Sequence, residues 1–419
     1  MKILYLCPDL GIPVLGHKGG SIHVRSLIAA LRRMGHSIVL AAPLLNGQHS
    51  PEPAAVDATL LHLPPSADGV GAPRALEAFN ERLGVANSLP GEFRKILYDQ
   101  DLATQLRYRF EPDPPDFIYE RASLYTTAGV SLARELNRPL LIELNAPLAL
   151  EHSVYRTAEL RELAAAAEGW VLSRADAVLA VSAPVRDHAL SLGVEWGRIH
   201  VIPNGVETSL FRPGRQDPAV RARWGLDDGP VLGFVGGMRP WHGVETLPAL
   251  LERLVEVRPN VSLVLTGDGP LRRDLERDVW ERGLSRSVVF TGPLPQPEVA
   301  ELIRHFDVAL APYPLPEHDF YFSPLKLFEY MGCGTPVVAA GLGQIAEVVR
   351  DGETGLLYPP GDLDALTARC DLLLSDPTLR RRLGRAAAEE VHARYTWDHN
   401  AARVVELAES LIAKRMVIW

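Results

Sequence analysis

The sequence of 419 residues has little of what marks membrane, secreted or metal-clip proteins. Its three cysteines, Cys7, Cys333 and Cys370, lie far apart, so they provide neither a disulfide framework nor paired zinc ligands. No apolar run reaches the roughly 20 residues that span a bilayer, and the short run after Met1 has no signal-peptide cleavage site. These absences favour a cytoplasmic protein.

Basic charge and the common phosphate-binding signatures are also lacking. The formal net charge is -9 and the isoelectric point is about 5.8, whereas a dedicated nucleic-acid binder is usually basic. We therefore expect no nucleic-acid partner. No GxGxxG follows an expected strand and no GKS/T ending is present, which disfavours a NAD-dependent dehydrogenase and a Walker-type NTPase.

Short apolar runs alternate with amphipathic segments along the whole chain, a pattern typical of parallel sheets covered by helices. The strands expected in the first half are Lys2–Cys7, Ser37–Ala42, Thr59–Leu63, Phe117–Glu120, Leu140–Leu144 and Ala177–Val181. Those expected in the second half are Val231–Val235, Ser262–Thr266, Val288–Thr291, Val308–Ala311 and Val337–Ala339. The expected helices include Ser21–Met34, Arg156–Ser173, Val244–Val257, Leu271–Arg282, Gln296–Arg304 and Thr396–Met416.

This pattern predicts an α/β protein with two doubly wound sheets. The joint between them is expected at Ile202–Val206, which contains Pro203 and an Asn-Gly turn. We expect loop-rich insertions at Asn46–Pro73 and Leu89–Asp116, which are rich in Pro and Gly. Since open parallel sheets bind ligands at the carboxyl ends of their strands, polar residues at those ends are the candidates for chemistry.

Two candidate groups follow strands in the first half. Gly19 and Gly20 precede a helix for which Ser21 is the expected N-cap, a layout that suits an anion, although a plain glycine turn is the alternative. His23 either lines the site or packs as a hydrogen-bonded histidine. Glu143 and Asn145 end another strand, where Glu143 either binds an acceptor hydroxyl or serves as a structural carboxylate.

Two further groups lie in the second half, and the first of them follows a strand. Gly236 and Gly237 lead to Arg239, which suits phosphate, and to His242, which can donate to phosphate; an exposed loop with a packed Trp241 is the alternative.

The other group is a helix that we expect to start with Ser323 as N-cap and Pro324 as its first residue. Lys326 and Glu329 then lie three residues apart, a spacing that fits a phosphate and the ribose hydroxyls of one nucleotide. A helical salt bridge is the alternative.

Taken in order, these motifs resemble the retaining GT-B glycosyltransferases of family 4 along nearly the whole chain. The motifs are Gly19-Gly20 with His23, Ile202–Val206, Val235–Gly243, Gly267–Pro270, and Lys326, Glu329 and Gly334–Val338 with Glu347. The resemblance implies two Rossmann-like domains facing a cleft. Residues 1–203 would form the acceptor domain and 204–399 the donor domain, with a C-terminal helix, 400–419, crossing back to the N-terminal domain.

The resemblance also implies the reaction. A sugar would pass from a nucleoside-diphosphate sugar, with UDP or GDP the leading carriers, to a hydroxyl of an acceptor sugar, a lipid-linked sugar or a small molecule. Transfer would retain the anomeric configuration and need no metal and no cofactor. By position, Glu329 would bind the ribose. The diphosphate would be bound by the amides of Leu325 and Lys326 and by the glycines Gly19 and Gly20. The charge that develops on the leaving group would be stabilised by Arg239, His242 and Lys326.

Four positions depart from the family pattern. Where the family has a carboxylate for the donor sugar, this chain has Tyr321, and where the family has a phosphate-binding arginine and lysine, it has Gly237 and His242. The histidine that the family often has on the acceptor side is replaced by Asn145. Arg239 lies two residues from Gly237 and can replace the missing cation. We interpret the chain as a branch with shifted site residues. The alternatives are a non-catalytic sugar-nucleotide-binding regulatory subunit and a GT-B-like pseudo-glycosyltransferase or epimerase.

A minor hypothesis is peripheral contact with the inner membrane face. No acidic residue occurs between Gly11 and Ser50, and Leu89–Phe110 carries four basic residues among apolar ones. A solvated surface, with its arginines paired to Asp99 and Asp101, ranks higher. The sequence contains no signature of an oligomeric state.

Overall fold

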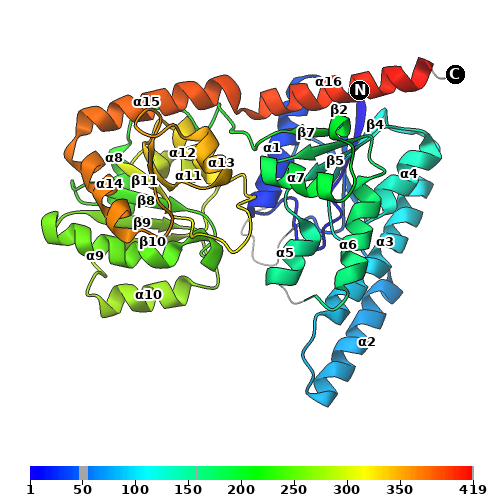
Figure 1. Ribbon diagram of the computed structural model, residues 1–419, viewed down its shortest axis with the longest axis horizontal. Helices are drawn as coiled ribbons and strands as arrows, with labels where there is room; N and C mark the ends of the chain where they lie inside the picture. The colour runs from blue at the N-terminus through cyan, green and yellow to red at the C-terminus, as the bar shows by residue number, and fades with distance from the viewer. Residues whose placement is uncertain (47–54, 156–157, 418–419) are drawn as a thin grey trace. The chain divides into compact units, whose positions relative to one another are not determined.

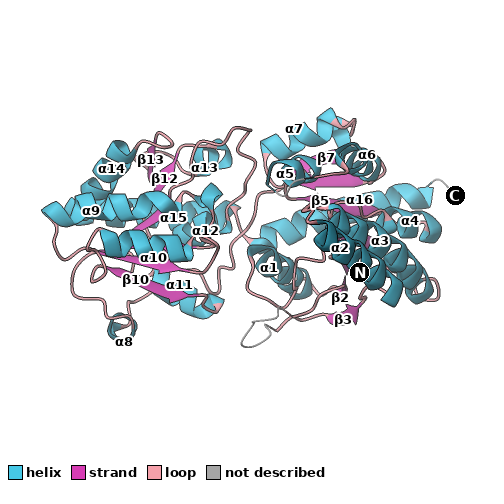
Figure 2. Ribbon diagram, turned by 90° about the horizontal axis from the view of Figure 1, so that it is seen from below, coloured by secondary structure: helices cyan, strands magenta, loops and turns pink. Residues whose placement is uncertain are grey.

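The computed structural model describes residues 1–46, 55–155 and 158–417. The chain divides into two compact units, one made of Met1–Pro203 with Asp398–Trp419 and the other of Asn204–Trp397. We call them the N-terminal unit and the C-terminal unit. Each contains one parallel sheet with helices on both of its faces (Figure 2). The prediction of two doubly wound α/β sheets is confirmed.

The N-terminal unit has a seven-stranded sheet in the order β3-β2-β1-β4-β5-β6-β7. Its strands are β1 (Lys2–Leu6), β2 (Ser37–Ala42), β3 (Thr59–His62), β4 (Phe117–Arg121), β5 (Leu140–Leu144), β6 (Ala177–Ala180) and β7 (Ile199–Val201). Its helices are α1 (Gly19–Arg33), α2 (Ala67–Leu83), α3 (Leu89–Phe110), α4 (Ala128–Leu136), α5 (Leu148–Tyr155), α6 (Arg161–Leu172) and α7 (Ala183–Ser191), with most of α16 (Trp397–Val417).

The C-terminal unit repeats this topology in a six-stranded sheet, ordered β10-β9-β8-β11-β12-β13. Its strands are β8 (Val231–Val235), β9 (Ser262–Thr266), β10 (Val288–Gly292), β11 (Val308–Ala311), β12 (Val337–Ala340) and β13 (Leu356–Tyr358). Its helices are α8 (Pro218–Arg223), α9 (Leu247–Val257), α10 (Arg272–Glu281), α11 (Gln296–Ile303), α12 (Leu325–Gly332), α13 (Gly343–Val348), α14 (Leu363–Ser375) and α15 (Pro377–Arg394).

The apolar runs form strands because both faces of each sheet are covered. Ile3–Leu6 in β1 and Leu140–Leu144 in β5 are buried along their whole length, and so are Val308–Ala311 in β11 and Val337–Ala340 in β12. A strand buried on both faces needs apolar residues without alternation, which is the pattern in the sequence. In each sheet the strand order reverses between the first and fourth strands, β1 and β4 or β8 and β11.

The prediction of loop-rich insertions is wrong for residues 67–73 and 89–110, which are helical, whereas 55–58, 63–66 and 111–116 lie outside helices and strands. Residues 67–83 and 89–110 form the long helices α2 and α3, which pair side by side (Figure 1). Pro90 falls in the first turn of α3, where a missing N–H costs nothing, and Gly84 ends α2 in a left-handed conformation. Residues 47–54 of the first expected insertion lie outside the described residues.

Some other element boundaries also differ from prediction. Helix α6 begins at Arg161, not at Arg156, and residues 156–157 lie outside the described range. The strands β7 and β13 were not predicted, because three residues are too few to show a period.

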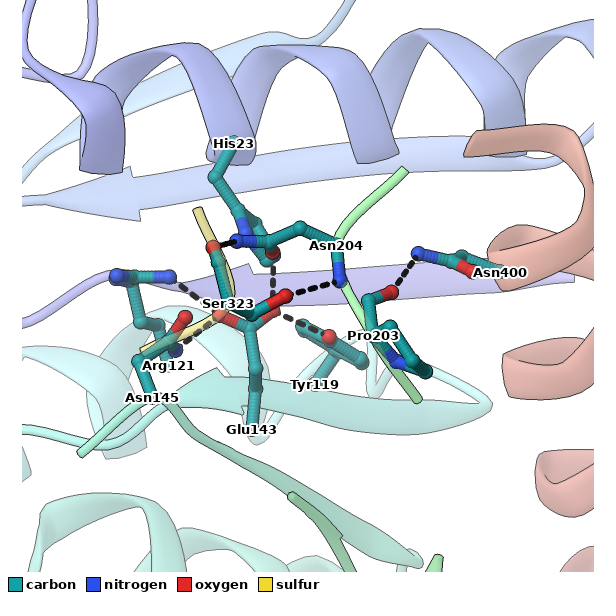
Figure 3. Close-up of polar contacts among 9 residues, drawn as sticks. All are labelled: His23, Tyr119, Arg121, Glu143, Asn145, Pro203, Asn204, Ser323 and Asn400. Carbon is teal, nitrogen blue, oxygen red and sulfur yellow. Dashed lines mark hydrogen bonds and ion pairs between the residues drawn. The ribbon is translucent and has the colours of Figure 1, made fainter. Parts of the chain in front are cut away.

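Both serines that we expected to cap helices have other roles. Helix α1 begins at Gly19, and the Ser21 hydroxyl donates to the Pro13 carbonyl at 2.6 Å. Helix α12 begins at Leu325 with Pro324 as its N-cap, and Ser323 Oγ accepts from the backbone N–H of Asn204 at 2.9 Å (Figure 3). In each case a bond to a residue outside the helix, Pro13 for Ser21 and Asn204 for Ser323, replaces the cap.

Helix α16 runs along the N-terminal unit after the chain leaves the C-terminal unit (Figure 1). Asp398 at its start pairs with Arg33, Arg415 near its end pairs with Asp176, and the Asn400 amide donates to the Pro203 carbonyl at 2.8 Å (Figure 3). Among the described residues, none of the helices combines the length and the apolar character that crossing a bilayer requires.

Candidate functional site

Each unit gathers its candidate residues at the carboxyl ends of the strands where the order reverses. In the N-terminal unit, Arg121 ends β4 and Glu143 lies in β5, beside the start of α1. In the C-terminal unit, Gly236 follows β8, and Tyr313 follows β11. Doubly wound sheets bind ligands at this position, because loops diverge there and leave a crevice.

The centre of the N-terminal cluster is Glu143, which has four side-chain partners (Figure 3). Its Oε2 accepts from His23 Nε2 at 2.7 Å and from the Tyr119 hydroxyl at 2.5 Å. Its Oε1 accepts from Arg121 and from Asn145. Glu143 is 2% exposed. Both oxygens are fully engaged, so the structure favours the structural role of this carboxylate over acceptor binding.

The charge state of Glu143 follows from these partners. Burial by itself would raise the pKa of the carboxyl, but the charges of His23 and Arg121 and the hydrogen bonds hold its pKa far below the usual range. The same carboxylate acts in the opposite sense on Tyr119, whose pKa is raised by burial and by the neighbouring negative charge. Glu143 is therefore ionised and Tyr119 is neutral and donates.

Sequence reasoning missed Tyr119 and Arg121. It predicted His23, Glu143 and Asn145 as site candidates, and the structure places all three in one cluster with Tyr119 and Arg121. Arg121 is also next to Gly20, where an added Cβ would lie 3.6 Å from Nη2. The signal was available, because Arg121 is a charged residue at the end of a strand, like Glu143.

The centre of the C-terminal cluster is Lys326, in the first turn of α12. The residue is only 7% exposed, and its Nζ has no hydrogen-bond partner within the described residues. Nζ lies 4.0 Å from the ring centre of Phe234 and 5.3 Å from that of Tyr313. It also lies beside Gly236, where an added Cβ would come within 2.8 Å of it. No salt bridge joins Lys326 and Glu329 in the described chain, which rules out the alternative that they pair as a helical salt bridge.

Burial controls the protonation of both residues. It lowers the pKa of Lys326 to about 7, with Glu329 opposing the shift, and it raises the pKa of Glu329 to about 7, with Lys326 opposing. A buried ammonium has three donors and needs acceptors. An anionic ligand with oxygen atoms near Gly236 would supply them.

His242 belongs to the short helical turn Pro240–His242, after β8. Its Nδ1 lies 2.5 Å from the Gly237 carbonyl, which can only accept, so Nδ1 carries the hydrogen. Burial, with the charges of Lys326 and Arg239, lowers the pKa of the ring to about 3. His242 is therefore neutral with an accepting Nε2, and the expectation that it donates to phosphate while neutral does not hold.

The remaining predicted residues surround this cluster. Arg239 is exposed and its guanidinium lies 5.1 Å from the ring centre of Trp241. Leu325 is the first residue of α12, and Gly237 bonds His242 through its carbonyl. Tyr321 is 2% exposed and stacks on His318, with ring centres 5.1 Å apart.

The helix α3 bears on the membrane hypothesis. Asp99 accepts from Thr127 and from the Ala128 backbone, and Asp101 accepts from the Ser66 backbone, so neither carboxylate is held by the arginines that we expected to pair with them.

The described residues contain no group of three or more His, Cys, Asp or Glu side chains placed to hold a metal ion.

Two family models match the chain. The model described as Glycosyltransferase Family 4 covers residues 17–210, and the model described as Glycosyl transferases group 1 covers residues 229–376. The two models thus correspond to the two units in order.

Curated relatives match over long segments. The alpha-maltose-1-phosphate synthase of Mycolicibacterium smegmatis is 32% identical over 265 residues, which are 59% of this chain and 66% of that protein. The GDP-mannose-dependent alpha-(1-6)-phosphatidylinositol monomannoside mannosyltransferase of the same species is 30% identical over 284 residues, 62% of this chain and 74% of that protein.

Solved structures share the fold. Anabaena HepE, crystallised in complex with UDP, superposes with a TM-score of 0.68 at 20% identity, and the match covers 98% of this chain and 100% of that one.

Proposed function

This chain belongs to the family 4 glycosyltransferases of the GT-B type, and we propose that it moves a sugar from a nucleoside-diphosphate sugar to an acceptor hydroxyl, with retention and without a metal ion. The observation that carries the proposal is Lys326, a buried lysine whose Nζ has no acceptor among the described residues. A buried cation without acceptors is unfavourable by itself, and a diphosphate removes the penalty.

The nucleotide would bind the C-terminal unit. Its diphosphate would contact Lys326, Arg239 and the free N–H groups of Leu325 and Lys326 at the start of α12, and its ribose would bond to Glu329. These groups would stabilise the negative charge that develops on the leaving diphosphate. UDP and GDP are the leading carriers, and HepE, which shares the fold, binds UDP.

The N-terminal unit would hold the acceptor near His23, Asn145 and Arg121. Glu143 would position these three side chains without reacting, since all its hydrogen-bonding positions are taken. With that carboxylate engaged, we propose attack from the leaving-group side. The bond from the anomeric carbon to the diphosphate oxygen breaks, the acceptor oxygen bonds on the same face, and its proton passes to the departing phosphate.

A thermal-shift panel with UDP, GDP, ADP and dTDP, each with and without Mg²⁺, tests donor binding. A ligand that binds only the folded state raises the melting temperature by mass action. We expect one diphosphate to raise it without Mg²⁺. A flat panel at millimolar concentrations would contradict the proposal.

The stereochemical part needs a separate measurement. Hydrolysis of the nucleotide sugar that binds, followed by NMR before the free sugar equilibrates, reports the anomer that is released first. Retention predicts the anomer of the donor, and the opposite anomer would contradict it. Binding without any turnover, even with a range of acceptors, would point to a regulatory subunit.

A further inference from the structure

We infer that His242 recognises a hydroxyl group of the transferred sugar, accepting its hydrogen bond at Nε2, and does not bind the phosphates. The inference rests on the proposed function, because its ligand is the nucleoside-diphosphate sugar. It gives the residue a role in selecting the donor, in place of the charge stabilisation that the sequence suggested.

The first step of the argument is the tautomer. The Gly237 carbonyl has no hydrogen to give, and it lies 2.5 Å from Nδ1. The hydrogen of a neutral imidazole is therefore on Nδ1, and Nε2 has a lone pair. No hydrogen bond to Nε2 occurs within the described ranges, and Nε2 is not a buried unsatisfied atom.

The second step is the surroundings of the ring. The rings of Tyr313, Trp241 and Phe234 lie 5.6, 6.2 and 6.3 Å from it between ring centres. The charged groups that act on it are the cations Lys326 and Arg239. Aromatic packing and two nearby cations both disfavour a positive imidazolium.

The third step is what such a nitrogen can bind. A lone pair repels phosphate oxygens, which have only lone pairs to offer, and it attracts an O–H group. The ribose hydroxyls are assigned to Glu329 and the phosphates to Lys326 and Arg239. The donors that remain are the N–H groups of the base and the hydroxyls of the transferred sugar. The base lies beyond the ribose, whereas the sugar hydroxyls lie next to the diphosphate in any nucleotide sugar, and Lys326, assigned to the diphosphate, acts on the His242 ring.

The test compares nucleotide with nucleotide sugar. Using the base that the thermal-shift panel selects, affinities are measured for UDP and UDP-glucose, GDP and GDP-mannose, or ADP and ADP-glucose. His242→Phe keeps an aromatic ring but removes Nε2, and His62→Phe, on the N-terminal unit, is the matched control.

We expect His242→Phe to bind the nucleotide sugar about 3- to 10-fold more weakly, the loss of one neutral hydrogen bond, and to bind the diphosphate within about twofold of wild type. The wild-type to variant ratio should be the same at pH 6 and pH 8. The inference would be overturned if the variant bound both ligands equally more weakly, or if it bound both as wild type does. It would also be overturned if wild type and variant bound the nucleotide sugar equally well at pH 8 but not at pH 6.

The tautomer is tested without any ligand. Proton–nitrogen correlation spectra of the histidine rings, with His242 identified by its loss in His242→Gln, should show a neutral ring protonated at Nδ1. A ring protonated at Nε2 overturns the inference while leaving the proposed function intact. If no nucleotide or nucleotide sugar binds the wild type, both fall together. If His242→Phe does not fold, His242→Leu, which also has no acceptor at that position, serves in the binding test.

Discussion

Glu143 and Lys326 are both buried charged side chains beside a helix start, but their surroundings differ. Glu143 has four hydrogen-bonding partners within its own unit, whereas the Lys326 ammonium has none among the described residues and lies against two aromatic rings. A buried charge is tolerated when it is paired and is costly when it is not. The N-terminal cluster is therefore complete without a ligand, whereas under the proposed function the diphosphate of the donor would complete the C-terminal cluster.

The largest effect is expected from breaking the complete cluster. Glu143→Ala leaves Arg121 buried without its carboxylate, and the free energy of unfolding of the protein should fall by about 3–5 kcal/mol, measured by urea unfolding. Glu81→Ala removes an exposed carboxylate from α2 in the same unit and should change it by less than about 0.5 kcal/mol. Similar values for the two variants would show that the network adds little to stability.

The next effect concerns the incomplete cluster. Lys326→Met should weaken binding of the selected nucleoside diphosphate by about 10- to 100-fold, since charge-assisted hydrogen bonds contribute about 1.5–3 kcal/mol. The ligand-free protein should be no less stable than wild type, because the substitution removes an unpaired charge. Lys414→Met, an exposed lysine of α16, is the control. If Lys326→Met bound the diphosphate normally but unfolded more easily than wild type, Lys326 would be a structural residue like Glu143 and would not bind the ligand.

The pH dependence of that stability difference sharpens the test. Lys326 has a folded pKa of about 7 and a reference value of 10.5, so between these values the unfolded chain holds the proton and the folded one does not. The penalty from Lys326 is full below pH 7 and disappears as the pH rises to 10.5. The advantage of Lys326→Met over wild type should shrink over that range, and a constant difference would contradict it.

Glu120 lies next to Arg121 in β4 but faces α4. Its Oε2 lies against Gly129 and has no hydrogen-bond partner among the described residues. Burial and the neighbouring Asp99 raise its pKa from 4.5 to about 8. The folded state therefore holds this proton more tightly, and stability is lost as the pH rises from 4.5 through 8. Glu120→Gln should exceed wild type by about 1–3 kcal/mol at pH 9 and by less at pH 5. Parallel stability curves would show that Glu120 is ionised in the folded protein.

The smallest effect is expected at a surface ion pair. Arg33 and Asp398 form a 2.7 Å pair between α1 and α16, with about half of each side chain exposed. Solvent screens such a pair, so Asp398→Ala should cost about 0.5 kcal/mol or less, and less still in high salt. A loss as large as that of Glu143→Ala would mean that α16 depends on this contact.

The sequence predicted most of the secondary structure, because the relevant patterns are local. The apolar runs of β2, β5, β8, β9 and β11 have the predicted bounds, and candidates such as Glu143 and Gly236 were singled out because they lie at or just after strand ends. The helices α2 and α3 were missed because their segments contain prolines and glycines. Pro90 falls in the first turn of α3, where it does no harm, but Pro73 lies inside α2, where local sequence patterns argue against a helix.

The sequence by itself thus determined the two α/β sheets, the family and which polar residues end the strands, since apolar period and motif order are local properties of the chain. Only the tertiary structure decided that Glu143 meets a histidine 120 positions away, that the Lys326 ammonium has no hydrogen-bond partner among the described residues, and that His242 is protonated at Nδ1. The charge of a side chain depends on its burial and on its neighbours. Residues distant in sequence become neighbours only when the strands and helices of a unit pack together.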